Sequence, residues 1–154
     1  LEIREIMSDW SRIYVDACCH IADAHLKNRI GYGKSACGVL IIDTKNNEYE
    51  FSKYLGDKTV PEAEFEGLIF ALDKASEVLQ RNQNIEVWMD SELVVKWMNK
   101  EYRLKKQHIK PLYDQACALS QRFTNIKCYH HSSDSEFAKR VDRIAETEYK
   151  KHHK

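Results

Sequence analysis

The sequence has no long apolar segment. No run approaches the roughly 20 consecutive apolar residues that a helix needs to cross a bilayer. The chain does not open with the charged and then apolar regions of a secretory signal. It also has no CxxC pair, and its odd number of cysteines lie mostly within apolar runs: Cys18, Cys19, Cys37, Cys117 and Cys128. These absences predict a cytoplasmic protein without membrane contact, whose thiols are reduced and buried.

The sequence also lacks net charge, because 24 basic residues balance 24 acidic ones. No global basic field therefore draws the protein to nucleic acid. One segment differs, since six basic residues and one acid lie between Lys96 and Lys110, interleaved with aromatic residues. Such a segment can bind a nucleic-acid backbone, and Lys105 and Lys106 are its central candidates. A solvated helix face is the alternative interpretation.

At 154 residues, the chain has the length of one domain with a substantial core. It contains no internal repeat and no low-complexity linker. We expect a single domain over residues 1–154, with flexible ends at 1–8 and 150–154.

The periodicity of apolar residues predicts an α/β fold. Alternating or continuous apolar runs indicate strands at Ser11–Cys19, Ala36–Ile42, Glu48–Leu55, Asn84–Met89 and Asn125–His131. The segment Asp43–Asn47 is typical of a hairpin turn, and the polar segment His20–Ser35 of a long loop. Helices are expected over 61–81, after the cap residue Ser91, from Pro111, and from Asp134 or Ser135. This order predicts a five-stranded mixed sheet, three antiparallel strands and then parallel ones, with helices on both faces.

The helix over 61–81 carries three glutamates in its first turns. At 3.6 residues per turn, Glu64 shares a face with the core-facing Leu68, whereas Glu62 and Glu66 are expected at the surface. A carboxylate on the buried side must be protonated, hydrogen-bonded or bound to metal. Glu64 therefore needs partners elsewhere in the chain, unless the first turn frays and releases it to solvent.

Three further acids interrupt the burial pattern. Asp16 lies within the first strand, Asp90 ends the strand 84–89, and Asp142 lies at the rim of the apolar face of the last helix. Each acid alone fits a turn, a cap or a solvated rim. Four carboxylates close together, however, repel one another unless divalent cations bind them. Oxygen ligands favour Mg²⁺ or Mn²⁺, and two such ions can activate water for phosphodiester hydrolysis.

A zinc site is a weaker alternative. It could be built from Cys18, Cys19, His20 and His25, or from Cys128, His130 and His131. Neither spacing fits a standard zinc pattern, so buried packing is the preferred role of these cysteines.

Five segments together resemble the type 1 ribonucleases H, in the branch related to the RNase H domains of reverse transcriptases. They are YVDACC, AEFEGLIFAL, VWMDSELVVKWMN, AKRVDRIAE and NKEYRLKKQHIKPLYDQACALSQRF. The first four carry Asp16, Glu64, Asp90 and Asp142 at the family's metal-binding positions. The likeness covers most of the chain from Ile13 to Ala145.

This resemblance implies an endonuclease that cleaves the RNA strand of RNA/DNA hybrids with two Mg²⁺ ions, which Mn²⁺ can replace. Asp16, Glu64, Asp90 and Asp142 would be the catalytic and metal-binding residues. Thr59 and Ser91 would bind substrate, and either His130 or His131 would assist proton transfer, with His131 preferred. The protein is expected to be a monomer.

The sequence also departs from the family in the segments that read the RNA sugar. The Gly-rich loop after the first aspartate is replaced by ACCHIADAHLKNRIGYG, and two asparagines by Val60 or Pro61 and by Ala138. A binding module of weak activity, or a related nuclease with another substrate, therefore remains an alternative. The exonucleases of the superfamily usually show D-x-E in the first strand, which the chain lacks.

Overall fold

The computed structural model describes residues 9–21, 31–80, 83–101, 103 and 106–153. They form one five-stranded sheet in the order β3-β2-β1-β4-β5. The strands are β1 (Trp10–His20), β2 (Tyr32–Ile42), β3 (Glu48–Thr59), β4 (Asn84–Met89) and β5 (Asn125–His130). The helices are α2 (Val60–Val78), α3 (Glu92–Met98), α4 (Lys110–Ser120) and α5 (Glu136–Lys151).

The pairing of the strands confirms the predicted mixed sheet. The strands β1, β2 and β3 are antiparallel, whereas β4 pairs parallel with β1, and β5 parallel with β4. The β2–β3 hairpin closes where expected, since Asp43 Oδ1 accepts hydrogen bonds at 2.9 Å from the amides of Lys45 and Asn47. Asn46 adopts a φ of 66° in this turn, a conformation that asparagine tolerates better than most residues.

The predicted loop His20–Ser35 is partly wrong. His20 ends β1, and Tyr32 begins β2, which pairs with the far end of β3 as far as Thr59. The pairing of β2 with β3 continues through this polar segment, because the strand register shifts between Ser35 and Ala36 and Gly56 adopts a φ of 78°. Cross-strand hydrogen bonding therefore extends both strands through residues whose polarity predicted a loop.

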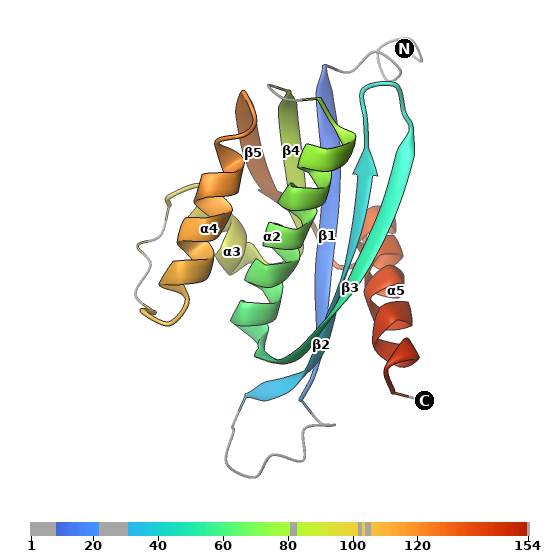
Figure 1. The fold of residues 1–154 in the computed structure, drawn as a ribbon, viewed down its shortest axis with the longest axis vertical. Coiled ribbons are helices and arrows are strands. Elements are labelled where there is room, and N and C mark those ends of the chain that lie inside the picture. Colours follow the sequence, from blue (N-terminus) through green and yellow to red (C-terminus); the bar gives the residue numbers. More distant parts are fainter. Residues whose placement is uncertain (1–8, 22–30, 81–82, 102, 104–105, 154) are drawn as a thin grey trace.

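The helices cover the two faces of the sheet unequally (Figure 1). The main core lies under α2, α3 and α4, where Phe65, Leu68 and Leu72 pack on Ile13 and Val15 of β1. On the opposite face α5 is the only described helix, and it covers β1, β2 and β3 through small clusters around Tyr14 and Cys18. Successive residues of β1 alternate between these faces, so its even-numbered residues lie beneath α5.

The ends of two helices differ from the prediction. Helix α2 begins with a capping box, in which Thr59 Oγ1 accepts from the Glu62 amide and Glu62 accepts from the Thr59 amide; it ends at Val78. Helix α5 extends through Lys150 to Lys151, and the rings of His152 and His153 contact Tyr54. The flexibility expected at 150–154 stays a prediction. The end expected at 1–8 lies outside the described residues.

Among the described residues no helix combines the length and the apolar character needed to span a membrane.

Candidate functional site

Asp16 lies in the middle of β1, on the face that α5 covers. Its partner in the antiparallel ladder is Gly38 of β2. A Cβ at position 38 would lie 2.5 Å from the Val141 carbonyl oxygen and 2.7 Å from the Ala145 amide nitrogen. The absence of a side chain at Gly38 therefore lets α5 approach the sheet closely, and this approach brings Asp142 to Asp16.

The surroundings of Asp16 raise its pKa to about 9. Burial is the largest cause, followed by the charge of Asp90 and by the hydrogen bond and charge of Asp142. The Asp16 residue is 8% exposed, whereas Asp90 and Asp142 are exposed. Without a cation, the buried member of the three therefore holds a proton near neutral pH, because like charges in one place disfavour ionisation.

Glu64 joins the same site from α2. Its carboxylate accepts a hydrogen bond from the Ser91 hydroxyl, which lowers its pKa, but burial and the charge of Asp90 outweigh this and raise it. Ser91 Oγ also accepts from the Val94 amide at 3.3 Å and so caps α3. Ser91 is therefore both a helix cap and the residue that orients Glu64; its predicted contact with substrate stays a prediction.

The structure thus brings together the four acids that the sequence singled out, here called the carboxylate cluster: Asp16, Glu64, Asp90 and Asp142. Their donors are all oxygens, which suits Mg²⁺ or Mn²⁺. The raised pKa of Asp16 shows a surplus of negative charge that a divalent cation would relieve. The residues present therefore fit a divalent metal, and their catalytic roles stay predictions.

The other two glutamates of α2 are not simple surface acids. Glu66 pairs with Lys58 of β3 at 3.0 Å and its side chain is 28% exposed. Glu62 belongs to the capping box of α2. Both side chains stay partly exposed at the surface, as expected, and β3, which extends alongside the start of α2, supplies a partner for each.

The two candidate histidines differ in their surroundings. His130 ends β5 and is exposed. The ring of His131 stacks on Tyr14 with centroids 6.1 Å apart, and its Nε2 is buried without a hydrogen-bond partner among the described residues. Burial lowers the pKa of His131, against the charge of Asp90, which raises it. His131 is therefore the histidine coupled to the carboxylate cluster, and its role in proton transfer stays a prediction.

The other predicted substrate contacts, besides Ser91, are only partly described. Thr59 is half-buried, and its hydroxyl already caps α2. In the basic segment, Lys96 pairs with Glu92 at 2.9 Å and Lys110 with Asp114 at 2.8 Å. Lys106 is exposed, and Lys105 lies outside the described residues. The segment is thus less positive than its composition indicates.

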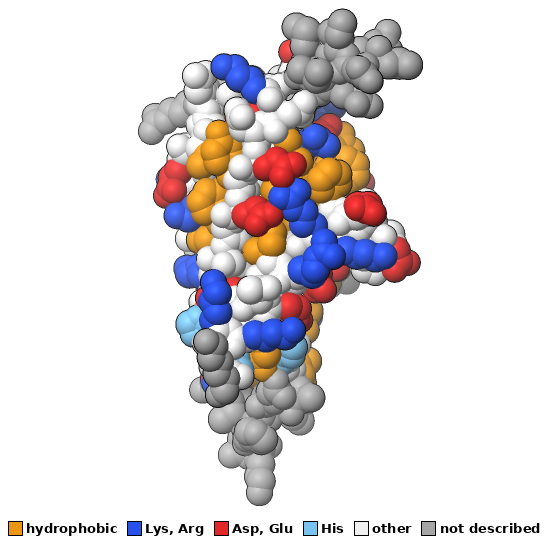
Figure 2. Space-filling model, turned by 90° about the vertical axis from the view of Figure 1, so that its right-hand side faces the viewer, with side chains coloured by type: hydrophobic (Ala, Val, Ile, Leu, Met, Phe, Trp, Pro, Cys, Tyr) orange, Lys and Arg blue, Asp and Glu red, His pale blue; other side chains and the backbone are white. Residues whose placement is uncertain are grey.

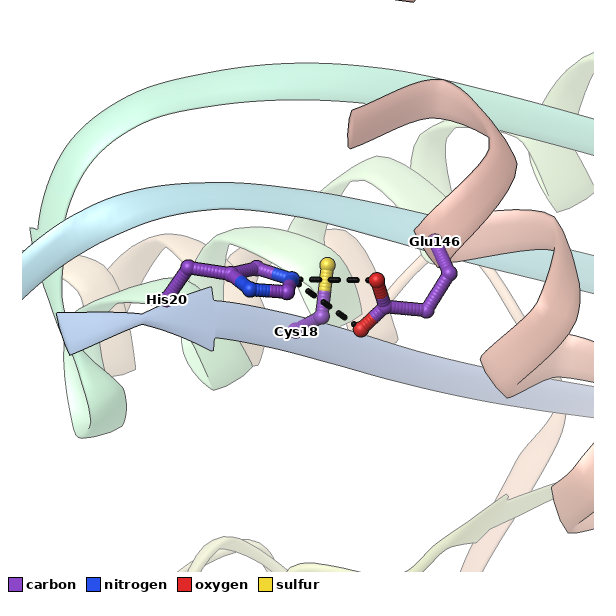
Figure 3. Close-up of side chains that lie close together, drawn as sticks. All are labelled: Cys18, His20 and Glu146. Carbon is purple, nitrogen blue, oxygen red and sulfur yellow. Dashed lines mark hydrogen bonds and ion pairs between the residues drawn. The ribbon is translucent and has the colours of Figure 1, made fainter. Parts of the chain in front are cut away.

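The residues of the first zinc alternative meet different partners. All five cysteines are free thiols. Cys19 donates from Sγ to the Lys58 carbonyl at 3.4 Å, and His25 lies outside the described residues. Cys18 and His20, however, meet Glu146 of α5, which the sequence analysis did not single out (Figure 3). We call Cys18, His20 and Glu146 the mixed-donor cluster; Glu146 lies one helical turn beyond Asp142, which is the signal that could have indicated it.

Several solved structures similar to this chain are RNase H1 enzymes or RNase H domains. An RNase H1 isolated from compost by a metagenomic approach is 28% identical, with a TM-score of 0.79 over 95% of this chain and 99% of that chain. The N-terminal RNase H domain of a Mycobacterium tuberculosis protein is 25% identical, with a TM-score of 0.77 over 94% of this chain and 96% of that chain. The compost enzyme has also been crystallised with an RNA/DNA hybrid; in that complex it is 27% identical, with a TM-score of 0.75 over 94% of this chain and 99% of that chain.

A family model described as reverse transcriptase-like matches residues 22–145. The matched segment contains Glu64, Asp90 and Asp142 and begins after Asp16. The sheet order, the helices on both faces and the solved relatives agree with this match. The chain therefore belongs to the reverse transcriptase-like family of RNase H-like domains.

Proposed function

We propose that the protein is a metal-dependent endonuclease that hydrolyses the RNA strand of RNA/DNA hybrids. The observation that carries this proposal is the convergence of four acids onto one place in an RNase H fold: Asp16 of β1, Glu64 of α2, Asp90 directly after β4 and Asp142 of α5. A buried aspartate with two acids beside it costs stability, and a structural role alone does not account for it.

The four carboxylates are the residues that would hold two Mg²⁺ ions. When bound, such ions activate a water molecule and stabilise the leaving oxygen of a phosphodiester. Asp16 is the central ligand in this proposal, because both Asp90 and Asp142 act on it. Glu64 completes the cluster from the α2 side and is oriented by the Ser91 hydroxyl.

The protein groups around the cluster would position the substrate. The exposed Lys106, with Lys105, would contact phosphates of the hybrid, and Thr59 would contact the DNA strand. His131 would assist proton transfer, since a pKa below its ordinary value leaves its ring neutral and able to accept a proton near neutral pH. The hybrid is proposed as substrate because the compost RNase H1, of the same fold, was crystallised with one.

The test is cleavage of four labelled duplexes of one sequence: RNA/DNA hybrid, double-stranded RNA, double-stranded DNA, and a hybrid whose RNA strand carries 2′-O-methyl groups. Each is incubated with Mg²⁺, with Mn²⁺ and with EDTA. We expect internal cuts in the RNA strand of the unmodified hybrid alone, and none in EDTA.

Two outcomes would contradict the proposal in different ways. Hybrid binding without any cut under Mg²⁺ or Mn²⁺ would make the protein a binding module. Equal cleavage of double-stranded DNA would remove the specificity for hybrids while keeping the metal-dependent hydrolysis.

A further inference from the structure

The mixed-donor cluster is a compact group at the end of β1, where the strand lies against the C-terminal half of α5 (Figure 3). One ligand atom from each of Cys18, His20 and Glu146 lies within 4.8 Å of the other two. His20 Nε2 lies 3.1 Å and 3.0 Å from the two carboxylate oxygens of Glu146. Among the described residues, these three alone form a group of possible metal ligands that is this close.

The spacing of the donors is close to that of a single coordinated ion. Zinc bonds of about 2.0–2.3 Å in a tetrahedron separate neighbouring donor atoms by roughly 3.3–3.7 Å. Since the three donor atoms lie within 4.8 Å of one another, they are at most about 1 Å further apart than this spacing. Two of them are on alternate residues of one strand, and the third is on a helix packed over that strand, so the backbone holds all three on one side.

The surroundings orient the donors and leave an entrance for an ion. The ring of His20 stacks on Tyr149 with centroids 3.7 Å apart, which fixes its plane. The side chains of His20 and Glu146 are 31% and 30% exposed, whereas Cys18 is 8% exposed. Figure 2, which views the side of the molecule to the right in Figure 1, shows histidine side chains near the lower end of that face.

From this geometry we infer that Cys18, His20 and Glu146 bind one transition-metal ion, Zn²⁺ in the first place, in a site separate from the carboxylate cluster. A thiolate, an imidazole and a carboxylate are the donor types that zinc takes, and three protein ligands leave a fourth position for water. Oxygen-preferring Mg²⁺ is a poor match for this set. The inference does not depend on the proposed nuclease activity, because no catalytic residue belongs to the site.

A hydrogen-bonded histidine–glutamate pair is the simpler account of two of these residues. This pair gives no role to the Cys18 thiol, which is only a weak hydrogen-bonding group. The two accounts differ in what happens at Cys18: metal binding makes its sulfur a thiolate ligand and releases its proton, whereas the pair alone leaves it a thiol.

The experiment is equilibrium dialysis of the purified full chain against Zn²⁺ in a large excess of Mg²⁺, which competes for the carboxylate cluster. A parallel titration with Co²⁺ reports the thiolate-to-cobalt charge-transfer absorption. We expect one Zn²⁺ per chain, a charge-transfer band with Co²⁺, and a rise in melting temperature with Zn²⁺.

Matched variants assign the site. Cys18→Ser, His20→Gln and Glu146→Gln should each weaken Zn²⁺ binding by at least about 10-fold, and Cys18→Ser should remove the band. Cys19→Ser, the neighbouring thiol that bonds the Lys58 carbonyl, should keep both. Glu148→Gln, a glutamate on α5 that pairs with Ser52 and His152, should also keep both.

Far-ultraviolet circular dichroism checks that each variant is folded. The inference is overturned if the native chain binds no Zn²⁺ in excess Mg²⁺. It is equally overturned if folded Cys18→Ser binds Zn²⁺ as tightly as the native chain, or if bound Co²⁺ shows no charge-transfer band.

Discussion

The carboxylate cluster and the mixed-donor cluster share two elements, β1 and α5. Asp16 and Cys18 are two residues apart on β1, and Asp142 and Glu146 are four apart on α5, so each pair shares one face. The carboxylate cluster offers only oxygen ligands, whereas the mixed-donor cluster offers sulfur, nitrogen and oxygen. The mixed donors are also the tighter group, within 4.8 Å, whereas the acids converge from β1, α2, the turn after β4 and α5. One strand–helix contact can therefore present two kinds of metal site to different ions.

The difference in charge follows from the same comparison. In the carboxylate cluster, burial of Asp16 and then the charges of Asp90 and Asp142 raise the pKa of Asp16 to about 9. In the mixed-donor cluster, Glu146 has a histidine within 3.0 Å that can carry the opposite charge. Within the same cluster, burial and then the charge of Glu146 raise the pKa of the Cys18 thiol to about 12. Both clusters therefore disfavour ionisation of one buried group, and the following variants separate the two clusters.

Asp90→Asn should have the largest effect. We expect loss of hybrid cleavage by more than about 100-fold, because even partners outside the ligand set of a metal site cost 10- to 100-fold. Zn²⁺ binding at the mixed-donor cluster and the circular dichroism spectrum should not change. Glu92→Gln is the control, since this exposed acid pairs with Lys96 at 2.9 Å on α3 and should keep its cleavage rate. Full activity of Asp90→Asn would remove Asp90 from the active site.

Gly38→Ala should damage both clusters, because the added Cβ would push α5 away from the sheet. We expect a loss of about 1–3 kcal/mol of folding free energy, measured by urea unfolding, and weaker binding of both Mg²⁺ and Zn²⁺. The control is Gly67→Ala in α2, on the other face of the sheet. A Cβ added there would lie 3.3 Å from its nearest atom, and both clusters should stay intact. Unchanged metal binding in Gly38→Ala would show that the position of α5 does not set the two sites.

Ser91→Ala should affect the carboxylate cluster alone. It removes the cap of α3 and the donor to Glu64, so we expect a loss of about 1 kcal/mol in stability and at least about 10-fold in Mg²⁺ affinity by calorimetry. Ser135→Ala removes the cap of α5, whose Oγ accepts from Ala138 at 3.2 Å, and should cost similar stability without loss of Mg²⁺ affinity. An equal loss of Mg²⁺ affinity in both variants would assign the effect to helix capping.

Asp16→Asn should stabilise the protein in the absence of metal. In the folded protein the pKa of Asp16 is about 9, above its ordinary value of 3.8. Between pH 3.8 and 9, Asp16 therefore stays protonated in the folded state but is ionised in the unfolded chain. The contribution of protonated Asp16 to the free energy of unfolding is complete below pH 3.8 and is lost as the pH rises towards 9. Asparagine does not ionise, so in EDTA the variant should melt a few °C above the native chain at pH 8, and close to it at pH 4. A melting difference independent of pH would contradict the raised pKa.

Replacing Lys105 and Lys106 by alanine should have the smallest effect. It should not change metal binding at either cluster. We expect weaker hybrid binding and a slope of log K against log salt reduced by up to about 2, because each lysine releases roughly one counterion. Lys110→Ala is the control, because Lys110 already pairs with Asp114 at 2.8 Å. An unchanged slope would exclude this segment from the interface.

Local signals predicted much of the fold. The alternation in β1, the turn at Asp43 and the cap residues Ser91 and Ser135 act over a few residues, so the sequence alone indicates them. The extension of β2 and β3 to Tyr32 and Thr59 was not predicted, because it depends on pairing between distant strands.

The sequence by itself determined which acids stand against the burial pattern: Asp16 in a strand, Glu64 on a core-facing stripe, Asp90 at a strand end and Asp142 at a helix rim. Only the tertiary structure decided that Gly38 lets α5 approach Asp16, that Ser91 orients Glu64, and that Glu146 meets Cys18 and His20. The physical reason is that residue type and periodicity encode which face a side chain takes. The partner it meets depends on how closely distant elements pack, and here a missing side chain on β2 sets that distance.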